Sequence, residues 1–285
     1  MMPKIDLHIH SCISDGRHSP AEVVRKSAGM GMTLIAITDH DNVDAIVPAL
    51  EEAENFPGLT VVPGVEISTE MSQGEVHMLG YFIDYTNPEL VTALENMRNS
   101  RKKRGQEMID KLVNLGLPIE WERVQEIAGY GSVGRPHIAQ ALLEKGYITS
   151  LKDAFTEYLG WGKPAYASRE KVSPAEAVRL ILGAQGLPVL AHPLTINDPE
   201  ALIIQLKGKG LVGLEAYYGE YDSEEIARLA SLADKYDLIT TGGSDYHGLD
   251  DSTETLIGNI NMPPEVTEQL IALVEQRAVK SANTR

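Results

Sequence analysis

The sequence predicts an α/β fold: a closed or nearly closed barrel of seven strand–helix units that carries a small all-helical insertion. Short apolar segments alternate with amphipathic segments of helical length, a pattern typical of parallel strands joined by crossover helices. Seven such units are enough to close a barrel. The alternation stops between residues 88 and 168, where no strand is evident, and this gap predicts the insertion.

The first half of the chain contains four predicted strands and the two helices between them. In chain order these are strand 5–10, helix 19–32, strand 33–38, helix 42–55, strand 59–68 and strand 75–83. The first helix opens with Ser-Pro-Ala-Glu, which predicts Ser19 as its N-cap, Pro20 at its first position and Glu22 completing a capping box.

The predicted insertion begins with a long polar helix over residues 88–114. Shorter helices are expected at 121–128, 136–145 and 150–158. We therefore divide the chain into a barrel domain, residues 1–98 and 168–285, and a helical insertion domain, residues 99–167. The basic run from Arg101 to Arg104 is interpreted as a solvated helix face.

The second half of the chain repeats the strand–helix alternation. Its predicted elements are helix 173–186, strand 187–192, helix 198–209, strand 211–217, helix 223–236, strand 238–247 and helix 264–277. The helix at 173 again opens with Ser-Pro-Ala-Glu. The segments that begin at Ser19 and Ser173 are thus interpreted as equivalent units, each followed by a strand that ends at a histidine, His40 or His192.

Composition excludes several classes of function. The 285 residues include 43% hydrophobic residues, which suits a globular protein. A net charge of −16 argues against a duplex-DNA-binding or membrane-surface role. No apolar run has the length of a membrane span, no leader opens the chain, and Cys12 is the single cysteine, so a cytoplasmic location is expected.

Histidines and acids gather at the predicted carboxyl ends of the strands. Residues i and i+2 of a strand share a face, so His8 and His10 should point the same way. Six of the eight histidines and three acids fall at this rim: His8, His10, His40, His77, His192, His247, Asp15, Glu66 and Asp245. Imidazole and carboxylate are ligands of zinc, manganese and iron. Nine candidates suit a cluster of two or three ions, which Glu66 is best placed to bridge.

Other residues near the rim leave alternatives open. Glu215 ends the sixth strand and is either part of the site or a loop cap. Asp39 and Asp41 are favoured as helix caps or as partners that orient His40, rather than as direct ligands. His18 is expected to face solvent.

The predicted insertion carries a second signal, for an anion. Arg135 and His137 flank a proline at a helix start, where free N–H groups favour negative charge. Lys163 lies on a glycine-rich loop. Arg135 can bind a phosphate with two parallel hydrogen bonds and Lys163 can act as a point charge, although ordinary surface charge is the alternative for each.

The motifs together resemble a known family. "DLHIHS", "SDG", "TDHD", "GVEIS", "AHP" and "GSDYHG" occur in the order found in the PHP (polymerase and histidinol phosphatase) superfamily. "GRPHIA", "GWGKPAYAS" and the repeated Ser-Pro-Ala-Glu are similar to the bacterial subfamily of 3′,5′-nucleoside bisphosphate phosphatases and 5′→3′ exoribonucleases.

This resemblance implies a distorted seven-stranded, TIM-like barrel (the PHP fold) with two or three divalent ions, Mn first and Fe or Zn as alternatives. By position, the first ion would be held by His8, His10, Glu66 and Asp245, the second by Asp15, His40 and His247, and the third by Glu66, His77 and His192. Arg135 and Lys163 would hold a substrate phosphate, with His137 nearby. The chain departs from the family at Tyr221, where relatives often carry histidine, so the acid that protonates the leaving oxygen is open.

The expected function is metal-dependent hydrolysis of nucleotide phosphate esters. The substrates would be 3′,5′-nucleoside bisphosphates, losing the 3′-phosphate, or short 5′-phosphorylated RNA, with bound ions activating water and His192, Asp245 and His247 as catalytic residues. Three alternatives remain: a histidinol-phosphate phosphatase, an amidohydrolase of the urease type, and a non-catalytic, metal-stabilised interaction module. No strand ends in the lysine that commonly bridges metals in the urease type. The oligomeric state is left open.

Overall fold

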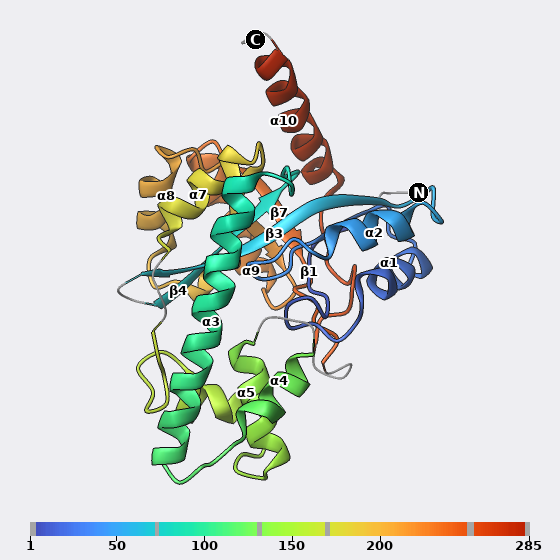
Figure 1. Cartoon of the computed structure of the whole chain (residues 1–285). Coiled ribbons are helices and arrows are strands. Elements are labelled where there is room, and N and C mark those ends of the chain that lie inside the picture. Colours follow the sequence, from blue (N-terminus) through green and yellow to red (C-terminus); the bar gives the residue numbers. More distant parts are fainter. Residues whose placement is uncertain (1–3, 72–73, 130–132, 169–171, 250–253, 283–285) are drawn as a thin grey trace.

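Seven strands form one sheet whose spatial order follows the chain (Figure 1). The computed structural model describes residues 4–71, 74–129, 133–168, 172–249 and 254–282. The strands are β1 (Ile5–Ile9), β2 (Leu34–Ile37), β3 (Thr60–Met71), β4 (Gly74–Tyr81), β5 (Leu187–Leu190), β6 (Gly213–Tyr218) and β7 (Ile239–Gly243). Most of their residues are buried, as expected of strands covered by helices on the outside and by side chains within.

The first and last strands meet and nearly close the barrel. Tyr246, just beyond β7, forms a parallel bridge with Ile9, and its carbonyl accepts a hydrogen bond from the N–H of His10 at 2.9 Å. The N–H of Asp245 donates to the carbonyl of His8, also at 2.9 Å. This closure confirms the predicted seven-stranded barrel. It also brings His8 and His10, near the start of the chain, next to Asp245 and Tyr246, near its end.

The direction of β4 corrects the prediction of an all-parallel sheet. β1, β2 and β3 pair in parallel, as do β5, β6 and β7, but β4 is antiparallel to both of its neighbours. β4 starts at Gly74, directly after β3 ends at Met71, so the connection has no room for a crossover helix and the strand must turn back. Consequently the beginning of β4, and not its end, reaches the rim, where His77 pairs with Ser68 of β3.

Helices cover the outside of the barrel. These are α1 (Pro20–Gly29), α2 (Ile46–Ala53), α7 (Pro174–Gly183), the 3₁₀-helix η2 (Pro193–Thr195), α8 (Pro199–Lys207), α9 (Ser223–Lys235) and α10 (Pro264–Ala282). Ser19 and Glu22 form the predicted capping box of α1, and the Ser173 side chain accepts the corresponding hydrogen bond at α7. α10 begins against the barrel, where Val266 and Leu270 are buried, and its later turns project away from it (Figure 1). Among the described helices, none is both long and apolar enough to cross a membrane.

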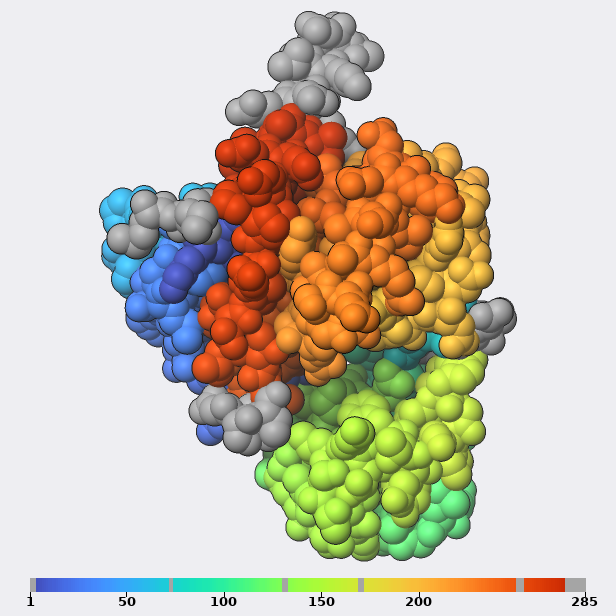
Figure 2. Space-filling model, turned by 180° about the vertical axis from the view of Figure 1, so that it is seen from behind, coloured from blue at the N-terminus to red at the C-terminus, as the bar shows by residue number. Residues whose placement is uncertain are grey.

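A lobe of helices stands beside the rim. It contains the second half of α3 (Pro88–Asn114), α4 (Trp121–Ala128), α5 (Arg135–Glu144), α6 (Leu151–Asp153) and the π-helix η1 (Ala154–Leu159). The first half of α3 packs against the barrel core through Leu90, Leu94 and Met97. Residues between 108 and 167 pack into a hydrophobic cluster of their own, which includes Met108, Leu112 and Leu142. Figure 2 shows these residues as a mass set off from the barrel. We call it the helical lobe; the predicted domain limit at residues 99 and 167 stays a prediction.

Candidate metal centre

The carboxyl end of β1 directs two imidazoles toward the same pair of carboxylates. Nε2 of His8 lies 3.5 Å from Oε2 of Glu66 and 3.3 Å from Oδ1 of Asp245. Nε2 of His10 lies 3.3 and 3.0 Å from the same two oxygens. The two rings are 5.2 Å apart, because residues i and i+2 of β1 share a face. The alternation of a short strand therefore creates one side of the site.

Glu66 is the central carboxylate of the site. It lies on β3, is 1% exposed, and its two oxygens contact five imidazoles. Oε1 lies 3.0 Å from Nδ1 of His77 and 3.1 Å from Nε2 of His192. Oε2 lies 2.8 Å from Nδ1 of His40. This arrangement fits the bridging role expected of Glu66.

A second group forms around Asp15, in the loop after β1. Its carboxylate lies 3.4 Å from Nε2 of His247, 3.6 Å from Nδ1 of His10 and 3.7 Å from Nε2 of His40. Nδ1 of His247 donates a 2.7 Å hydrogen bond to the backbone carbonyl of Asp245, which directs Nε2 toward Asp15. Strands β1, β2, β3, β4, β5 and β7 thus all contribute to one cluster.

Three buried atoms in this cluster have close polar neighbours but make no hydrogen bond of acceptable geometry among the described residues: His8 Nε2, His10 Nε2 and Glu66 Oε2. Leaving a buried polar atom unpaired costs about 1–3 kcal/mol. Three overlapping groups of side chains could each hold an ion, because the ligand atoms within each group lie within 4.8 Å of one another. The groups are His8–His10–Glu66, which contains all three of these residues, His10–Asp15–His40–His247, and His40–Glu66–His77. A cation would satisfy all three orphaned atoms at once, so the residues fit a metal cluster.

The carboxylates and imidazoles of the cluster shift one another's pKa values. Burial, together with the charge of His247, lowers the pKa of His10 to about 4, so this imidazole is neutral at pH 7. Burial alone would raise the pKa of Glu66, but the neighbouring His40 and His77 hold it well below its usual range. Burial opposes the charged form of the other rings, but the carboxylates outweigh it and raise the pKa of four imidazoles, namely His8, His40, His192 and His247. Because metals bind neutral imidazoles and ionised carboxylates, an ion would displace protons from these four rings as it binds.

Glu215 resolves an alternative that the sequence left open. It is fully buried; its Oε1 lies 2.9 Å from Nδ1 of His8, and its Oε2 accepts a 2.8 Å hydrogen bond from the N–H of His192. Because Glu215 takes Nδ1 of His8, Nε2 is left facing the cluster. Glu215 therefore orients two of the site's histidines from behind.

Asp39 and Asp41 hold loops rather than face the cluster. Asp39 accepts hydrogen bonds from the N–H and hydroxyl of Ser11 and from the hydroxyl of Ser14, at 2.6–2.8 Å. Asp41 accepts from the N–H of Ser68 at 2.8 Å and has φ 50°. Neither is a member of the three donor groups. They position the loops on either side of His40, in keeping with the favoured interpretation.

Two site residues, His192 and Asp245, have strained backbones, and Asp245 also has a hydrogen-bond partner, Tyr218, that the sequence did not predict. His192 and Asp245 have φ of 24° and 53°, in the left-handed region that side-chain-bearing residues seldom adopt. The predicted strand 238–247 ends at Gly243 for this reason. Tyr218, on β6, donates a 2.9 Å hydrogen bond to Oδ2 of Asp245 and lies against the His192 ring.

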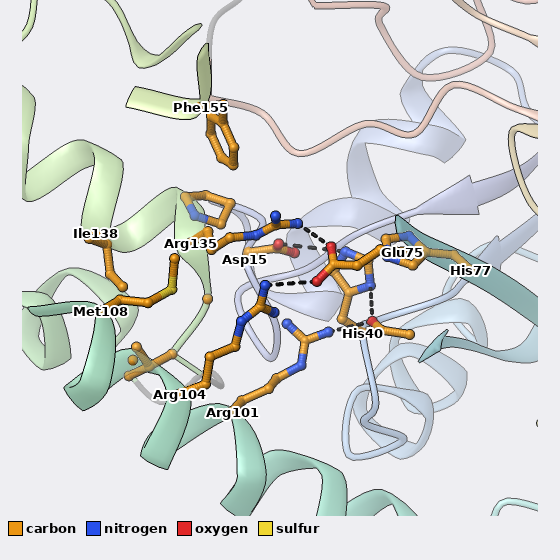
Figure 3. A pocket seen from close by; sticks show the side chains of 15 residues that line it. Asp15, His40, Glu75, His77, Arg101, Arg104, Met108, Arg135, Ile138 and Phe155 are labelled. Carbon is orange, nitrogen blue, oxygen red and sulfur yellow. Dashed lines mark hydrogen bonds and ion pairs between the residues drawn. The ribbon is translucent and has the colours of Figure 1, made fainter. Parts of the chain in front are cut away.

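A cavity of about 100 Å³ opens beside the cluster and leads to the helical lobe (Figure 3). Asp15, His40 and His77 line one side, and three arginines of the lobe line the other: Arg101, Arg104 and Arg135. We call this space the arginine cavity. Figure 3 shows the three guanidinium groups turned toward the metal-ligand side. An anionic ligand that entered it would contact both sets of residues.

The arginines correct the interpretation of residues 101–104 as a solvated face. Nε of Arg101 donates to Oδ2 of Asp41 at 2.7 Å, and its Nη2 donates to Ser68. Arg104 is 7% exposed and its Nη2 lies 2.8 Å from Oε1 of Glu75. Residues i and i+3 share a helix face, so the spacing of these two arginines was a signal of a common function. Lys102 and Lys103 of the same run are exposed.

The other predicted anion-binding residues occupy different positions. His137 is buried, and its Nδ1 accepts a 3.0 Å hydrogen bond from the N–H of Gly134, which fixes the start of α5. Lys163 is exposed and is not among the residues that line the arginine cavity. His18, expected to face solvent, is half-buried and stacks against Tyr246, so that prediction was wrong.

Comparisons with known proteins agree with this geometry. Residues 6–160 match the model of the PHP domain family. The chain is 31% identical to a 3′,5′-nucleoside bisphosphate phosphatase of Chromobacterium violaceum, over 92% of this chain and 94% of that protein. It is 35% identical to the 5′–3′ exoribonuclease Rnm of Escherichia coli, over 85% and 84%. A solved structure from Bifidobacterium adolescentis, titled as a metal-dependent phosphoesterase, superposes with a TM-score of 0.83 at 28% identity and covers 95% of this chain and 96% of its own.

Proposed function

The chain belongs to the PHP domain family and is a metal-dependent phosphoesterase, and on this premise we propose that it hydrolyses phosphate esters of nucleotides. The substrates we propose are 3′,5′-nucleoside bisphosphates, which lose the 3′-phosphate, and short 5′-phosphorylated RNA. One observation carries the proposal: three residues of the candidate metal cluster, Asp15, His40 and His77, line the same cavity as the three arginines. In this proposal the phosphate to be cleaved binds at the cluster, and the phosphate to be recognised binds at the arginines.

We propose two or three divalent ions, held as the family resemblance implies. His8, His10, Glu66 and Asp245 would bind the first, Asp15, His40 and His247 the second, and Glu66, His77 and His192 the third. The donor groups support this division in part: His8, His10 and Glu66 form one group, and Asp15, His40 and His247 belong to another. The third group joins Glu66 and His77 with His40 rather than His192, so the places of His192 and Asp245 rest on the resemblance. The nitrogen-rich set favours Mn, Fe or Zn over Mg, and Mn is our first choice. When bound, such ions supply Lewis-acid charge that polarises a phosphate oxygen and lowers the pKa of water.

The arginines recognise the second phosphate in this proposal. Arg135 and Arg104 present planar guanidinium groups, which suit bidentate binding of phosphate oxygens. Arg101 is already held by Asp41 and Ser68, so it contributes mainly positive charge. Lys163 would add a further charge from its exposed loop. These cations explain how a protein of net charge −16 can bind a small polyanion while it disfavours duplex DNA.

We assign the catalytic proton steps to His192, with Asp245 and His247. Burial lowers the pKa of the His192 ring, but its hydrogen bond to Glu66 and the charges of neighbouring carboxylates raise it above its usual value overall. His192 can give a proton to the leaving ribose oxygen only when its Nε2, which faces Glu66, does not hold an ion, so this role applies to a cluster of two ions. Tyr221, the departure from the family pattern, is the alternative acid: its hydroxyl accepts a 2.9 Å hydrogen bond from the N–H of Leu194, and burial raises the pKa of this hydroxyl, so it keeps its proton.

The test is a phosphate-release screen with Mn²⁺ against adenosine 3′,5′-bisphosphate, adenosine 3′-monophosphate, histidinol phosphate and short 5′-phosphorylated RNA. We expect release from the bisphosphate or the RNA and little from the other two. Preferred hydrolysis of histidinol phosphate would replace the proposal with that alternative. Absence of turnover with every ester would leave only a non-catalytic, metal-stabilised module.

The role of Arg135 has a separate test. Arg135→Ala should raise KM for the bisphosphate by roughly 10- to 100-fold, the scale of one charge-assisted hydrogen bond, and leave KM for a monophosphate nearly unchanged. Arg179→Ala is the matched control, because Arg179 pairs with Glu89 and Glu176 on the barrel surface. Unaltered selectivity in Arg135→Ala would show that Arg135 does not read the second phosphate.

A further inference from the structure

Glu75 is an acid that pairs with two of the three arginines of the cavity, Arg104 and Arg135. Its Oε1 lies 2.8 Å from Nη2 of Arg104, and its Oε2 pairs with Nη2 of Arg135 (Figure 3). Glu75 lies two residues before His77 on β4, so both side chains project from the same face of the strand. A single carboxylate thus bridges the two guanidinium groups that the proposed function assigns to a phosphate.

A carboxylate held in this way has the same contacts that a phosphate would make. Both groups offer two or more anionic oxygens, so a phosphate can place one oxygen at each guanidinium group, as Glu75 does. We infer that Glu75 occupies the anion position between Arg104 and Arg135 as a displaceable occupant, and that the recognised phosphate of the substrate must compete with it. This inference rests on the proposed function and makes Glu75 a specificity-determining residue of the same site.

Two features of the surroundings make Glu75 displaceable. On the opposite strand its direct cross-strand neighbour is Glu70, and like charges in that position repel each other. Glu75 also lines a second cavity, of about 360 Å³, with Trp161, Thr195 and Asp198. The side chain therefore has adjoining space to enter when an anion takes over the arginines. Its 14% exposure shows that it is not sealed in place.

The competition between Glu75 and the substrate phosphate favours ligands whose anionic group carries more than one negative charge. A carboxylate carries one negative charge, whereas a terminal phosphate carries about −1.5 to −2 at pH 7 and offers three oxygens. A terminal phosphate can displace Glu75, and a group with a single charge, such as an internal phosphodiester or a carboxylate, competes poorly. Glu75 thereby favours substrates with a terminal second phosphate.

The experiment is calorimetric titration of adenosine 3′,5′-bisphosphate into EDTA-treated protein, which separates binding from turnover. Glu75→Gln should bind the bisphosphate roughly tenfold or more tightly than the unaltered protein, because the competing charge is gone. Binding of uncharged adenosine should not change. Equal or weaker binding of the bisphosphate by Glu75→Gln would overturn the inference, since Glu75 would then merely hold the arginines in place.

Two further variants keep the interpretation unambiguous. Glu89→Gln changes the net charge equally at a surface ion pair with Arg179 and should leave binding unaltered; a gain there would mean that overall charge causes the effect. In Glu75→Gln with Arg135→Gln the gain should disappear. If Glu75→Gln does not fold, Glu75→Asp is the substitute, because its shorter side chain withdraws the carboxylate from the arginines. Glu75→Asp should still bind the bisphosphate more tightly, and weaker binding would contradict the inference. Because no turnover is measured, a failed phosphate-release screen would not decide this result.

Discussion

At the scale of single residues, Glu66 is the position on which the cluster depends most. Replacing it by glutamine keeps its size but removes the negative charge that contacts five imidazoles. We expect Glu66→Gln to lose bound metal and at least roughly 100-fold in phosphate release, more than is usual for residues that only support ligands. Elemental analysis of the purified variant and a phosphate-release assay measure both effects. Normal metal content in Glu66→Gln would contradict the central role of this carboxylate; Glu176→Gln, on the exposed surface, is the control.

Glu215 offers a different residue-scale prediction, because it touches His8 from behind the cluster. Glu215→Gln keeps a hydrogen-bonding group at both partners but no longer holds the His8 ring by charge. Metal affinity should fall by roughly 10- to 100-fold while the fold is kept. A metal titration monitored by competition with a chromophoric chelator gives the affinity, and circular dichroism reports the fold. An affinity equal to that of the unaltered protein would show that Glu215 does not orient His8.

At the scale of elements, the contact between β1 and β7 positions the site. A Cβ atom at Gly243 of β7 would lie 2.1 Å from the Cβ of His8, far closer than atoms can approach, so only glycine fits there. We expect Gly243→Ala to destabilise the protein by several kcal/mol, on the scale of about 1–3 kcal/mol for overpacking and more where backbone must move, and to lower metal binding with it. Urea denaturation measures the loss. Gly29→Ala, where an added Cβ meets nothing within 4 Å, is the control and should be neutral or slightly stabilising.

The elements also show how far sequence reasoning reaches. The period of two in β1 and the Ser-Pro-Ala-Glu helix starts are local signals, and they predicted the pointing of His8 and His10 and the caps of α1 and α7. The antiparallel direction of β4 was missed because it follows from the short connection between β3 and β4, which leaves no room for a helix. The predicted strand ends were wrong by a few positions. Arg101 and Arg104 were misread because polarity alone does not reveal that a lobe folds over the rim. Glu75 could have been found from its spacing to His77.

At the scale of the whole molecule, the cluster concentrates negative charge that bound cations would balance. Six strands bring carboxylates and imidazoles into one buried region, and three of its atoms make no hydrogen bond of acceptable geometry among the described residues. Chelation should therefore lower the melting temperature by roughly 5 °C or more, and excess Mn²⁺ should restore it. Differential scanning fluorimetry with and without EDTA tests this. Identical melting curves would mean that bound ions contribute nothing to the folded state.

The antiparallel direction of β4 also fixes the distance between two residues that line the arginine cavity, Glu75 and His77. His77 and Glu75 are two residues apart on one face, about 6.8 Å along the strand. In the proposed function, His77 belongs to the site of cleavage and Glu75 to the site of recognition. Inhibition by alkane bisphosphates of increasing length should peak at one spacer, whereas a flat length dependence would contradict this. The pleat of a single strand would then set the distance between the two charged ends of the molecules that this protein accepts.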